Sequence, residues 1–191
     1  MTQLDSLTYL RPYDVSDDPF LYDVFATTWQ SEVAALPNQK LARHVLRIQH
    51  IAQERRFSAL HPGQQRFVVL ADGGRPAGRL YVHQDGEVTR IVDLTLMPEF
   101  RSRGIGTRIV RDLCRLAARD GDTLSLRVGR RNARVTDLYS RLGFKLVAVD
   151  DLDNHFEWTD PSTERADGVP AARREDSGKP DSRVGRGAPR R

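Results

Sequence analysis

The sequence predicts an α+β domain in which helices pack on the faces of a central, mostly antiparallel mixed sheet. Two observations carry this prediction. Three segments with strand character, separated by short turns, follow one another between residues 66 and 96. After residue 104, helical and strand periodicities alternate as far as residue 158, and two helical segments precede residue 62. We therefore expect the element order β-α-α-β-β-β-α-β-α-β-β.

The N-terminal elements are expected to be one strand, over residues 8–13, and two helices. Ser16-Asp17-Asp18-Pro19 combines capping side chains with a proline in the first turn, which starts a helix that runs to about residue 29. A longer helix opens at Pro37-Asn38 and ends at His61-Pro62-Gly63. Its apolar residues recur at helical spacing and predict one apolar face, formed by Leu41, Val45, Ile48, Ile51 and Ala52.

The middle of the chain is predicted to be an antiparallel meander of three strands. These strands cover residues 66–71, 77–83 and 89–96, and Pro98 ends the third. The turns between them are rich in glycine and aspartate, as tight hairpin connections require. Their sequences are Asp72-Gly-Gly-Arg-Pro76 and Gln84-Asp-Gly-Glu87.

The last part of the domain is predicted to alternate between helix and strand. Residues 105–119 form an amphipathic helix that ends at Gly121, and residues 132–142 form a second helix that ends at Gly143. Strands are expected at residues 123–128, 144–149 and 154–158. The folded domain is therefore predicted to span residues 1–158.

The composition changes after Trp158, where Pro, Gly, Ser, Arg and Asp dominate and large apolar side chains almost disappear. Such a segment cannot bury enough apolar surface to offset the entropy lost on ordering. We therefore expect residues 159–191 to be a disordered polar tail. The tail is either simply solvated or an electrostatic arm for an acidic partner.

The composition also limits the class of protein. No run of about 18 apolar residues predicts a membrane helix, and the first residues lack the pattern of a secretory signal. One cysteine cannot form an internal disulfide, which fits a cytoplasmic protein. Aromatic residues are only 7% of the chain, which argues against a nucleic-acid-binding module. The five histidines lack metal-ligand spacing, so no metal is expected.

A glycine-bearing turn, Arg101-Ser-Arg-Gly104-Ile-Gly106, separates the third meander strand from the next helix. Amides at a helix N-terminus lack intrahelical partners and favour anions, and glycine lets a phosphate approach the backbone closely. With Arg101 and Arg103 beside it, the turn predicts a diphosphate site. It is no P-loop, because Gly-Lys-Ser/Thr is missing. It is no dinucleotide fingerprint either, because residue 109 is isoleucine.

A second motif lies downstream, where Asn132 and Tyr139 are separated by two helical turns and therefore share one face. The two motifs are Pro98-x-x-Arg101-x-x-Gly104-x-Gly106 and Asn132-x6-Tyr139-x3-Gly143-Phe144. Together they resemble the GNAT superfamily of acetyl-CoA-dependent N-acetyltransferases, of the bacterial type. The resemblance covers about residues 8–158 in element order and implies the acyl-CoA N-acyltransferase fold.

The resemblance also implies roles for particular residues. Backbone groups of Leu94, Thr95 and Leu96 are expected to bind the pantetheine arm and the acetyl carbonyl of acetyl-CoA, the cosubstrate. The glycine turn is expected to hold the pyrophosphate, through Arg101, Ser102, Arg103, Gly104, Ile105, Gly106 and Thr107. Asn132 is expected to contact the pantetheine or a bound water, and Tyr139 to protonate the departing thiolate. For Tyr139 the alternative is a core tyrosine under the sheet.

The general base is less clear, because the glutamate that many relatives carry five residues before the asparagine is Arg127 here. Asp93 is one candidate base. Alternatively, Asp93 is a structural carboxylate paired with an arginine such as Arg90. In that case a chain of water molecules takes the proton from the amine, or the enzyme has no dedicated base. On the second predicted helix, Gln49, Gln53 and Phe57 either line the acceptor pocket or have a packing or surface role.

The predicted activity is transfer of an acetyl group to a primary amine of a small molecule or protein, by a monomer or homodimer. The alternative is a catalytically weak acyl-CoA-binding sensor or interaction domain.

Overall fold

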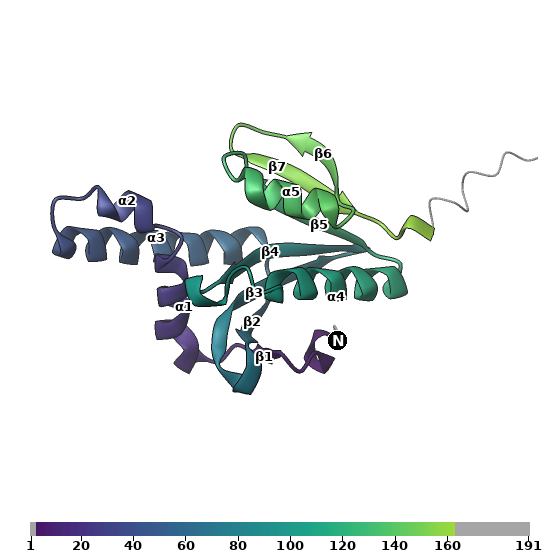
Figure 1. Cartoon of the computed structure of the whole chain (residues 1–191), viewed down its shortest axis with the longest axis horizontal. Helices are drawn as coiled ribbons and strands as arrows, with labels where there is room; N and C mark the ends of the chain where they lie inside the picture. Colours follow the sequence, from purple (N-terminus) through teal and green to yellow (C-terminus); the bar gives the residue numbers. More distant parts are fainter. Residues whose placement is uncertain (1–2, 163–191) are drawn as a thin grey trace, which may run out of the picture.

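The computed structural model describes residues 3–162, so the predicted tail lies outside the described residues except for residues 159–162. Seven strands form one sheet with the order β1-β2-β3-β4-β5-β7-β6 (Figure 1). The strands are β1 (Leu10–Pro12), β2 (Gln65–Leu70), β3 (Pro76–Asp85), β4 (Val88–Leu96), β5 (Thr123–Gly129), β6 (Lys145–Val149) and β7 (Asp153–Trp158). The predicted α+β fold class is confirmed. The predicted element order is correct except for one additional short helix, α2 (Gln30–Ala34), which lies between the two expected N-terminal helices.

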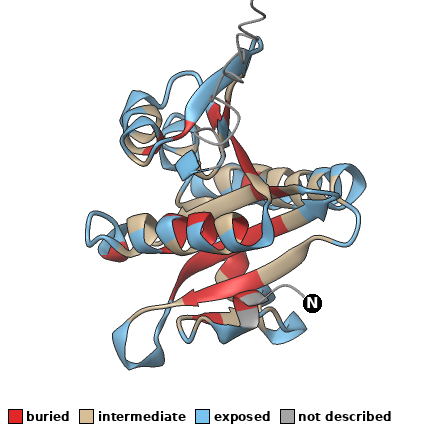
Figure 2. Cartoon of the chain, turned by 90° about the vertical axis from the view of Figure 1, so that its right-hand side faces the viewer, coloured by how far each residue is buried: buried red, intermediate tan, exposed pale blue. Residues whose placement is uncertain are grey.

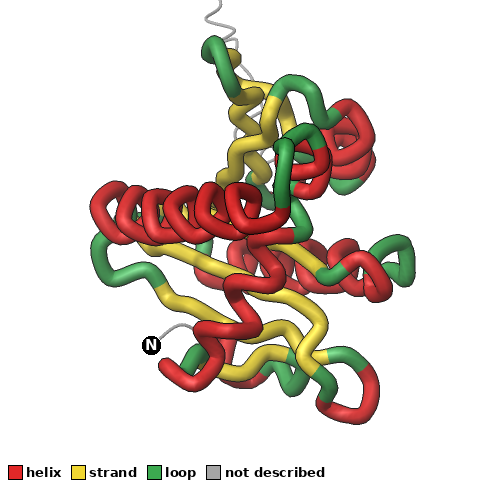
Figure 3. Tube along the Cα trace, turned by 90° about the vertical axis from the view of Figure 1, so that its left-hand side faces the viewer, coloured by secondary structure: helices red, strands yellow, loops and turns green. Residues whose placement is uncertain are grey.

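Helices cover both faces of this sheet. The helices are α1 (Asp18–Ala26), α2 (Gln30–Ala34), α3 (Gln39–Leu60), α4 (Ile105–Asp120) and α5 (Ala133–Arg141). Short 3-10 turns are η1 (Gln3–Ser6), η2 (Val15–Asp17), η3 (Asp72–Gly74) and η4 (Pro98–Phe100). The long helix α3 lies in front of the sheet in Figure 3, and α4 lies in front of it in the opposite view of Figure 2. Within residues 3–162 no helix combines the length and apolarity needed to cross a membrane.

The main hydrophobic core lies between the sheet and α4, with α5 packed on the same face. The inner side of α4 is buried as its periodicity predicts, through Ile109, Val110, Leu113, Cys114 and Ala117. A smaller cluster on the opposite face joins α1 and α3 to the sheet around Leu21, Val68 and Tyr81. We call these two sides the α4 face and the α3 face.

The prediction that α3 buries an apolar face is wrong. Three of its residues are substantially exposed: Leu41, Ile48 and Ile51. The side of the helix that meets the sheet contains one buried residue, Leu46, and a half-buried row of mostly polar residues: His50, Gln53, Glu54 and Phe57. The sheet beneath α3 presents Arg79 and the Tyr81 hydroxyl on this face. Polar side chains of α3 therefore face the sheet and accept hydrogen bonds from these two groups.

Strands β4 and β5 are the one parallel pair in the described sheet, and they pair over a short stretch only. Their register runs from Val88 opposite Thr123 to Ile91 opposite Leu126. Beyond Leu126, β5 pairs only with β7, and the rest of β4 pairs only with β3. The two strands therefore diverge in the middle of the sheet, and the edge of β4 that faces β5 has no strand partner from Val92 onward.

A β-bulge on β4 lies at the start of this divergence. On β3, Tyr81 is opposite Asp93 while the next residue, Val82, is opposite Ile91, so Val92 is the extra residue. Ile91 belongs to the core of the α4 face and Val92 to the cluster of the α3 face. Strict alternation would return Asp93 to the α4 face. The bulge instead turns Asp93 to the α3 face, where it lies beside Arg79 of β3.

Candidate active site

The glycine turn forms an open cradle of backbone amides at the start of α4. Gly104 is the N-cap of this helix and has the left-handed φ of 80°, while Ser102 has a φ of 59°. Among the described residues, none accepts a hydrogen bond from the amides of residues 102–107. Successive unpaired amides at a helix N-terminus create a concave site for an anion. The predicted diphosphate geometry is therefore available here.

Two arginine side chains brace this cradle. Arg134, in the first turn of α5, donates from Nη2 to Oγ of Ser102 over 2.7 Å. Arg101 points back into the fold, since its Nε donates to the Leu96 carbonyl over 2.8 Å and its Nη2 to Oγ1 of Thr27 over 2.7 Å. Arg101 therefore fastens the cradle to the end of β4 and to the end of α1, and Arg134 places a positive charge beside it.

The end of β4 brings the segment Leu94–Leu96 to the divergence. Leu94 and Leu96 pack against the main core, whereas Thr95 lies on the α3 face and donates to Oδ1 of Asp93 over 2.9 Å. Strand β3 supports this segment closely, because a Cβ added to Gly78 would stand 2.3 Å from the Thr95 carbonyl oxygen. The segment is thus held from one edge by β3, and its other edge faces the divergence.

Tyr139 lies on α5 at the α4 face, and its side chain is almost fully buried. Its ring packs at 5.3 Å from the Phe144 ring and 6.5 Å from the Phe156 ring, measured between centroids. Burial, with a further contribution from the negative charge of Asp93, raises the pKa of Tyr139 to about 12. No described residue forms a hydrogen bond with its hydroxyl. The hydroxyl therefore keeps its proton throughout the neutral range. Asp93 lies on the α3 face, and its negative charge acts on the hydroxyl across the sheet.

Asn132 is the N-cap of α5, where its Oδ1 accepts from the amide of Val135 over 3.4 Å. The cap starts the helix that carries Tyr139. Two helical turns between Asn132 and Tyr139 put both residues on one side of α5, as the spacing predicts.

Asp93 is paired with Arg79, not with Arg90, the arginine named in the sequence-based alternative. The Nε atom of Arg79 donates to Oδ2 of Asp93 over 2.5 Å, and the arginine side chain is only 1% exposed. Asp93 meets Arg79 because the bulge puts both side chains on the same face of the sheet. No ion pair joins Asp93 to Arg90 in the described part of the chain.

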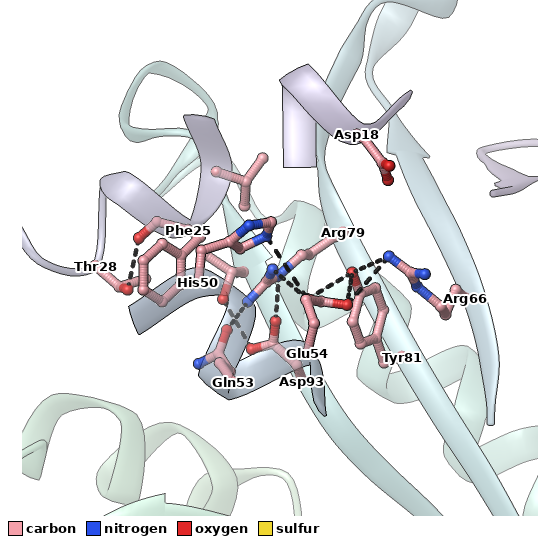
Figure 4. Close-up of polar contacts among 12 residues, drawn as sticks. Asp18, Phe25, Thr28, His50, Gln53, Glu54, Arg66, Arg79, Tyr81 and Asp93 are labelled. Carbon is pink, nitrogen blue, oxygen red and sulfur yellow. Dashed lines mark hydrogen bonds and ion pairs between the residues drawn. The ribbon is translucent and has the colours of Figure 1, made fainter. Parts of the chain in front are cut away.

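The Asp93–Arg79 pair belongs to a larger polar network between α3 and the sheet (Figure 4). Arg79 also donates to Gln53 Oε1 over 2.6 Å and to Glu54 Oε1 over 3.3 Å. The network continues from Glu54 to Tyr81 and Arg66, which also lies 3.8 Å from the Tyr13 ring centroid. Gln53 is therefore a partner of the buried arginine, and Phe57 packs edge-on against Tyr81.

Sequence reasoning missed Arg79, and it noted Arg134 only as one of several arginines clustered near the glycine turn, although each leaves a signal. Arg134 places a cation in the first turn of a helix, where the helix dipole disfavours it unless a partner or an anion is near. Arg79 interrupts an apolar strand on the side that faces α3. A charged residue at a fully buried strand position implies a partner of opposite charge.

The remaining candidates for chemistry are weak. Cys114 lies in the main core, and burial raises the pKa of its thiol to about 12, so the prediction of a core thiol is confirmed. Within residues 3–162, no group of three or more His, Cys, Asp or Glu side chains could hold a metal ion.

The sequence of residues 21–144 matches the model of the acetyltransferase (GNAT) family. The chain belongs to this family. The matched segment runs from α1 through the cradle to the end of α5, so it contains every residue of the candidate site. A search of curated proteins found no significant match.

Solved structures of GNAT acetyltransferases share the fold. PaiA N-acetyltransferase from Thermoplasma acidophilum, solved with coenzyme A, has a TM-score of 0.59 and 19% identity over 78% of this chain and 97% of its own. An acetyltransferase from Thermus thermophilus has a TM-score of 0.57, 18% identity and coverages of 78% and 95%. Spermidine N-acetyltransferase from Vibrio cholerae, solved with CoA and spermine, has a TM-score of 0.54, 13% identity and coverages of 78% and 94%.

Proposed function

We propose that this protein is an acetyl-CoA-dependent N-acetyltransferase that transfers the acetyl group directly to a primary amine. The observation that carries the proposal is the divergence of β4 and β5 after Ile91 and Leu126, with the amide cradle at one end and Tyr139 beside it. A ligand that joins a diphosphate to an extended polar arm, as acetyl-CoA does, matches both features. Two relatives in the same fold were crystallised with coenzyme A.

The chain's own groups fit the cosubstrate. The unpaired amides of residues 102–107 would receive the pyrophosphate, and Arg134 adds a positive charge beside them. The backbone groups of Leu94–Leu96 that face β5 have no strand partner. They would hydrogen-bond the pantetheine arm and the acetyl carbonyl, in the way that backbone groups of neighbouring strands bond each other. Asn132, at the entry of α5, would contact the pantetheine or a bound water.

Acetyl-CoA supplies the acetyl group as a thioester. The Tyr139 hydroxyl holds the proton that the departing thiolate needs, because its pKa of about 12 keeps it protonated at neutral pH. Amides near Leu96 would bind the negative charge that develops on the carbonyl oxygen. Direct transfer fits the state of Cys114, whose buried thiol does not ionise readily enough to accept the acetyl group first.

Asp93 is the proposed general base, acting on the incoming ammonium directly or through water. An amine with a pKa of about 10.4 is almost wholly protonated at pH 7, so some group must take its proton. The pair with Arg79 and the bond from Thr95 hold the carboxylate in place at the bulge. Both oxygens therefore already have donors, and a bridging water would be the route that leaves these bonds intact.

The proposal is tested by coenzyme A release in the presence of acetyl-CoA and a panel of amines, followed with a thiol reagent and by mass spectrometry of the acceptor. The chain's single cysteine is buried, so the protein itself contributes little to the thiol signal. Tyr139→Phe should lower the turnover and leave acetyl-CoA binding intact. Acetyl-CoA binding with no coenzyme A release for any amine would favour the acyl-CoA-binding sensor instead.

A further inference from the structure

A cavity of about 430 Å³ opens on the α3 face beside the divergence of β4 and β5. Its position follows from two of its lining residues, Ile91 and Val92, which are the last paired residue and the bulged residue of β4. A third, Arg127, is the first residue of β5 beyond the last pair. The amide cradle and Tyr139 belong to the opposite face. An acceptor in this cavity and acetyl-CoA on the α4 face would therefore meet at the divergence.

Five of the seven ionisable side chains that line this cavity are basic. They are Arg56, Arg90, Arg127, His61 and His83. The rings of His61 and His83 lie 5.3 Å apart between centroids. Phe57 and Leu60, from the last turns of α3, supply an apolar wall. Two aspartates, Asp85 and Asp153, also line the cavity.

The two strand arginines of this cavity have no direct ion-pair partner among the described residues. In the described part of the chain, neither Arg90 nor Arg127 forms an ion pair or a side-chain hydrogen bond, and the nearby carboxylates do not come within pairing distance of them. Partial burial and the charge of Arg127 lower the pKa of Arg90, although Asp85 and Glu157 act in the opposite sense. The two arginines therefore repel each other in a partly desolvated place, which an anion would relieve.

His61 experiences the same positive potential. Burial, followed by the charges of Arg90, His83 and Arg127, lowers the pKa of His61. A volume of about 430 Å³ suits a small molecule or a single amino-acid residue. Arginine binds carboxylate and phosphate through a planar fork of donors, and it is the side chain that suits such a group best.

We propose that the acceptor is a primary amine that carries an anionic group, a carboxylate or a phosphate, close to the amine, and that Arg90 and Arg127 bind this group. The inference rests on the proposed transfer to an amine and specifies the substrate class of that site. Binding the anion in the cavity directs the amine toward the divergence, where Asp93 lies on the same face. Polycationic amines are disfavoured by the same charges.

The test compares matched amines in the coenzyme A release assay. L-alanine against L-alaninamide reports on a carboxylate, O-phosphoethanolamine against ethanolamine reports on a phosphate, and spermidine is the polycation. A carboxamide lowers the pKa of the neighbouring amine and makes more of it neutral. A preference for the acid therefore cannot come from amine basicity. We expect at least one anionic amine to have a kcat/KM at least tenfold above that of its neutral partner and of spermidine.

Variants assign the effect to the cavity. Arg127→Gln and Arg90→Gln should each raise the KM for the anionic amine about tenfold or more, with the KM for acetyl-CoA unchanged. Arg111→Gln removes an equal charge from the exposed side of α4 and should change neither constant. A preference for spermidine or neutral amines, or Arg127→Gln without effect on the anionic amine, would overturn the inference while leaving the acetyltransferase intact.

A binding measurement separates this inference from the proposed function. Calorimetric titration of O-phosphoethanolamine and of L-alanine into the protein, with coenzyme A present, reports on the cavity without turnover. Binding of either compound that Arg127→Gln weakens supports the anion site even if no amine is acetylated, which would contradict the proposed function alone. Failure of both compounds to bind, together with turnover of a neutral amine, overturns the anion site alone.

Discussion

Arg79 and Asp93 form an ion pair across strands β3 and β4, with 2.5 Å between Nε and Oδ2 and with the arginine side chain 1% exposed. The pair connects the bulge of β4, at the divergence, to helix α3, because Arg79 also donates to Gln53 and Glu54. Removing one partner of such a pair leaves the other charge buried without compensation. The Arg79 side chain therefore contributes both to the position of α3 and to the orientation of Asp93.

Arg79→Met should destabilise the fold strongly, because Asp93 and Glu54 would keep their charges without the arginine that they share. We expect a loss of about 3–5 kcal/mol in the free energy of unfolding, measured with denaturant at pH 7. The double variant Arg79→Met with Asp93→Leu should recover part of this loss. A single variant as stable as the native protein would show that the pair contributes little.

Asp93→Asn tests the proposed base through its pH dependence. The amide keeps an acceptor for Arg79 but cannot take a proton. As the pH rises toward the amine pKa of about 10.4, free amine accumulates and the base is needed less. The ratio of native to variant kcat/KM should therefore be large near pH 7 and fall toward pH 10. A ratio that does not change with pH would assign Asp93 a structural role.

Tyr139→Phe should reduce kcat about 10²–10⁴-fold, the range typical of general acid catalysis. Stability should change little, because no described residue hydrogen-bonds the hydroxyl while the ring contacts with Phe144 and Phe156 remain. Since the pKa of Tyr139 is raised to about 12, its ionisation should not limit the native rate below pH 10. Steady-state rates from pH 6 to 10 check both points, and a native rate that falls with a pKa near 10 would contradict them.

The raised pKa of Tyr139 also makes the stability of the fold depend on pH. Burial raises the pKa of Tyr139 above the value of about 10 that it has in an unfolded chain, so the native state holds this proton more tightly. The resulting stabilisation is fully present below pH 10 and is lost as the pH rises from 10 toward 12. Tyr139→Phe should therefore lessen the decline of stability in that window, as measured by thermal unfolding.

Gly104→Ala should weaken acetyl-CoA binding. A left-handed alanine costs about 1–2 kcal/mol, so the cradle would be expected to leave the φ of 80° that opens its amides. Gly121→Ala is the matched control, because Gly121 has a φ of 77° at the other end of the same helix and equal free space around it. Both variants should lose similar stability, and only Gly104→Ala should lower the affinity measured by calorimetry. Equal affinities would argue against the cradle.

Cys114 should resist alkylation in the native state, because its thiol is buried and its pKa is raised to about 12. Iodoacetamide at pH 8 should modify the native protein far more slowly than the protein in denaturant, as followed by mass spectrometry. Rapid modification of the native protein would mean that α4 opens locally and that the thiol is more accessible than its burial implies.

Local sequence predicted most of the secondary structure correctly because each signal acts over a few residues. The inner face of α4 follows from helical spacing, and the cradle follows from glycines between a strand and a helix. The same reasoning failed for α3, where Leu41, Ile48 and Ile51 look like a core face but are exposed. Spacing identifies an apolar stripe, but it does not reveal that the sheet opposite offers a buried arginine.

The candidate site divides in the same way. Sequence alone determined the fold class, the amide cradle and the Asn132–Tyr139 pair, because these depend on backbone geometry and short-range periodicity. Only the tertiary structure decided that Asp93 meets Arg79, that Arg134 reaches Ser102, and that Arg90 and Arg127 share one cavity. The physical reason is that a single bulge reverses which face a strand residue occupies, and that charge pairing depends on distances between residues far apart in the chain.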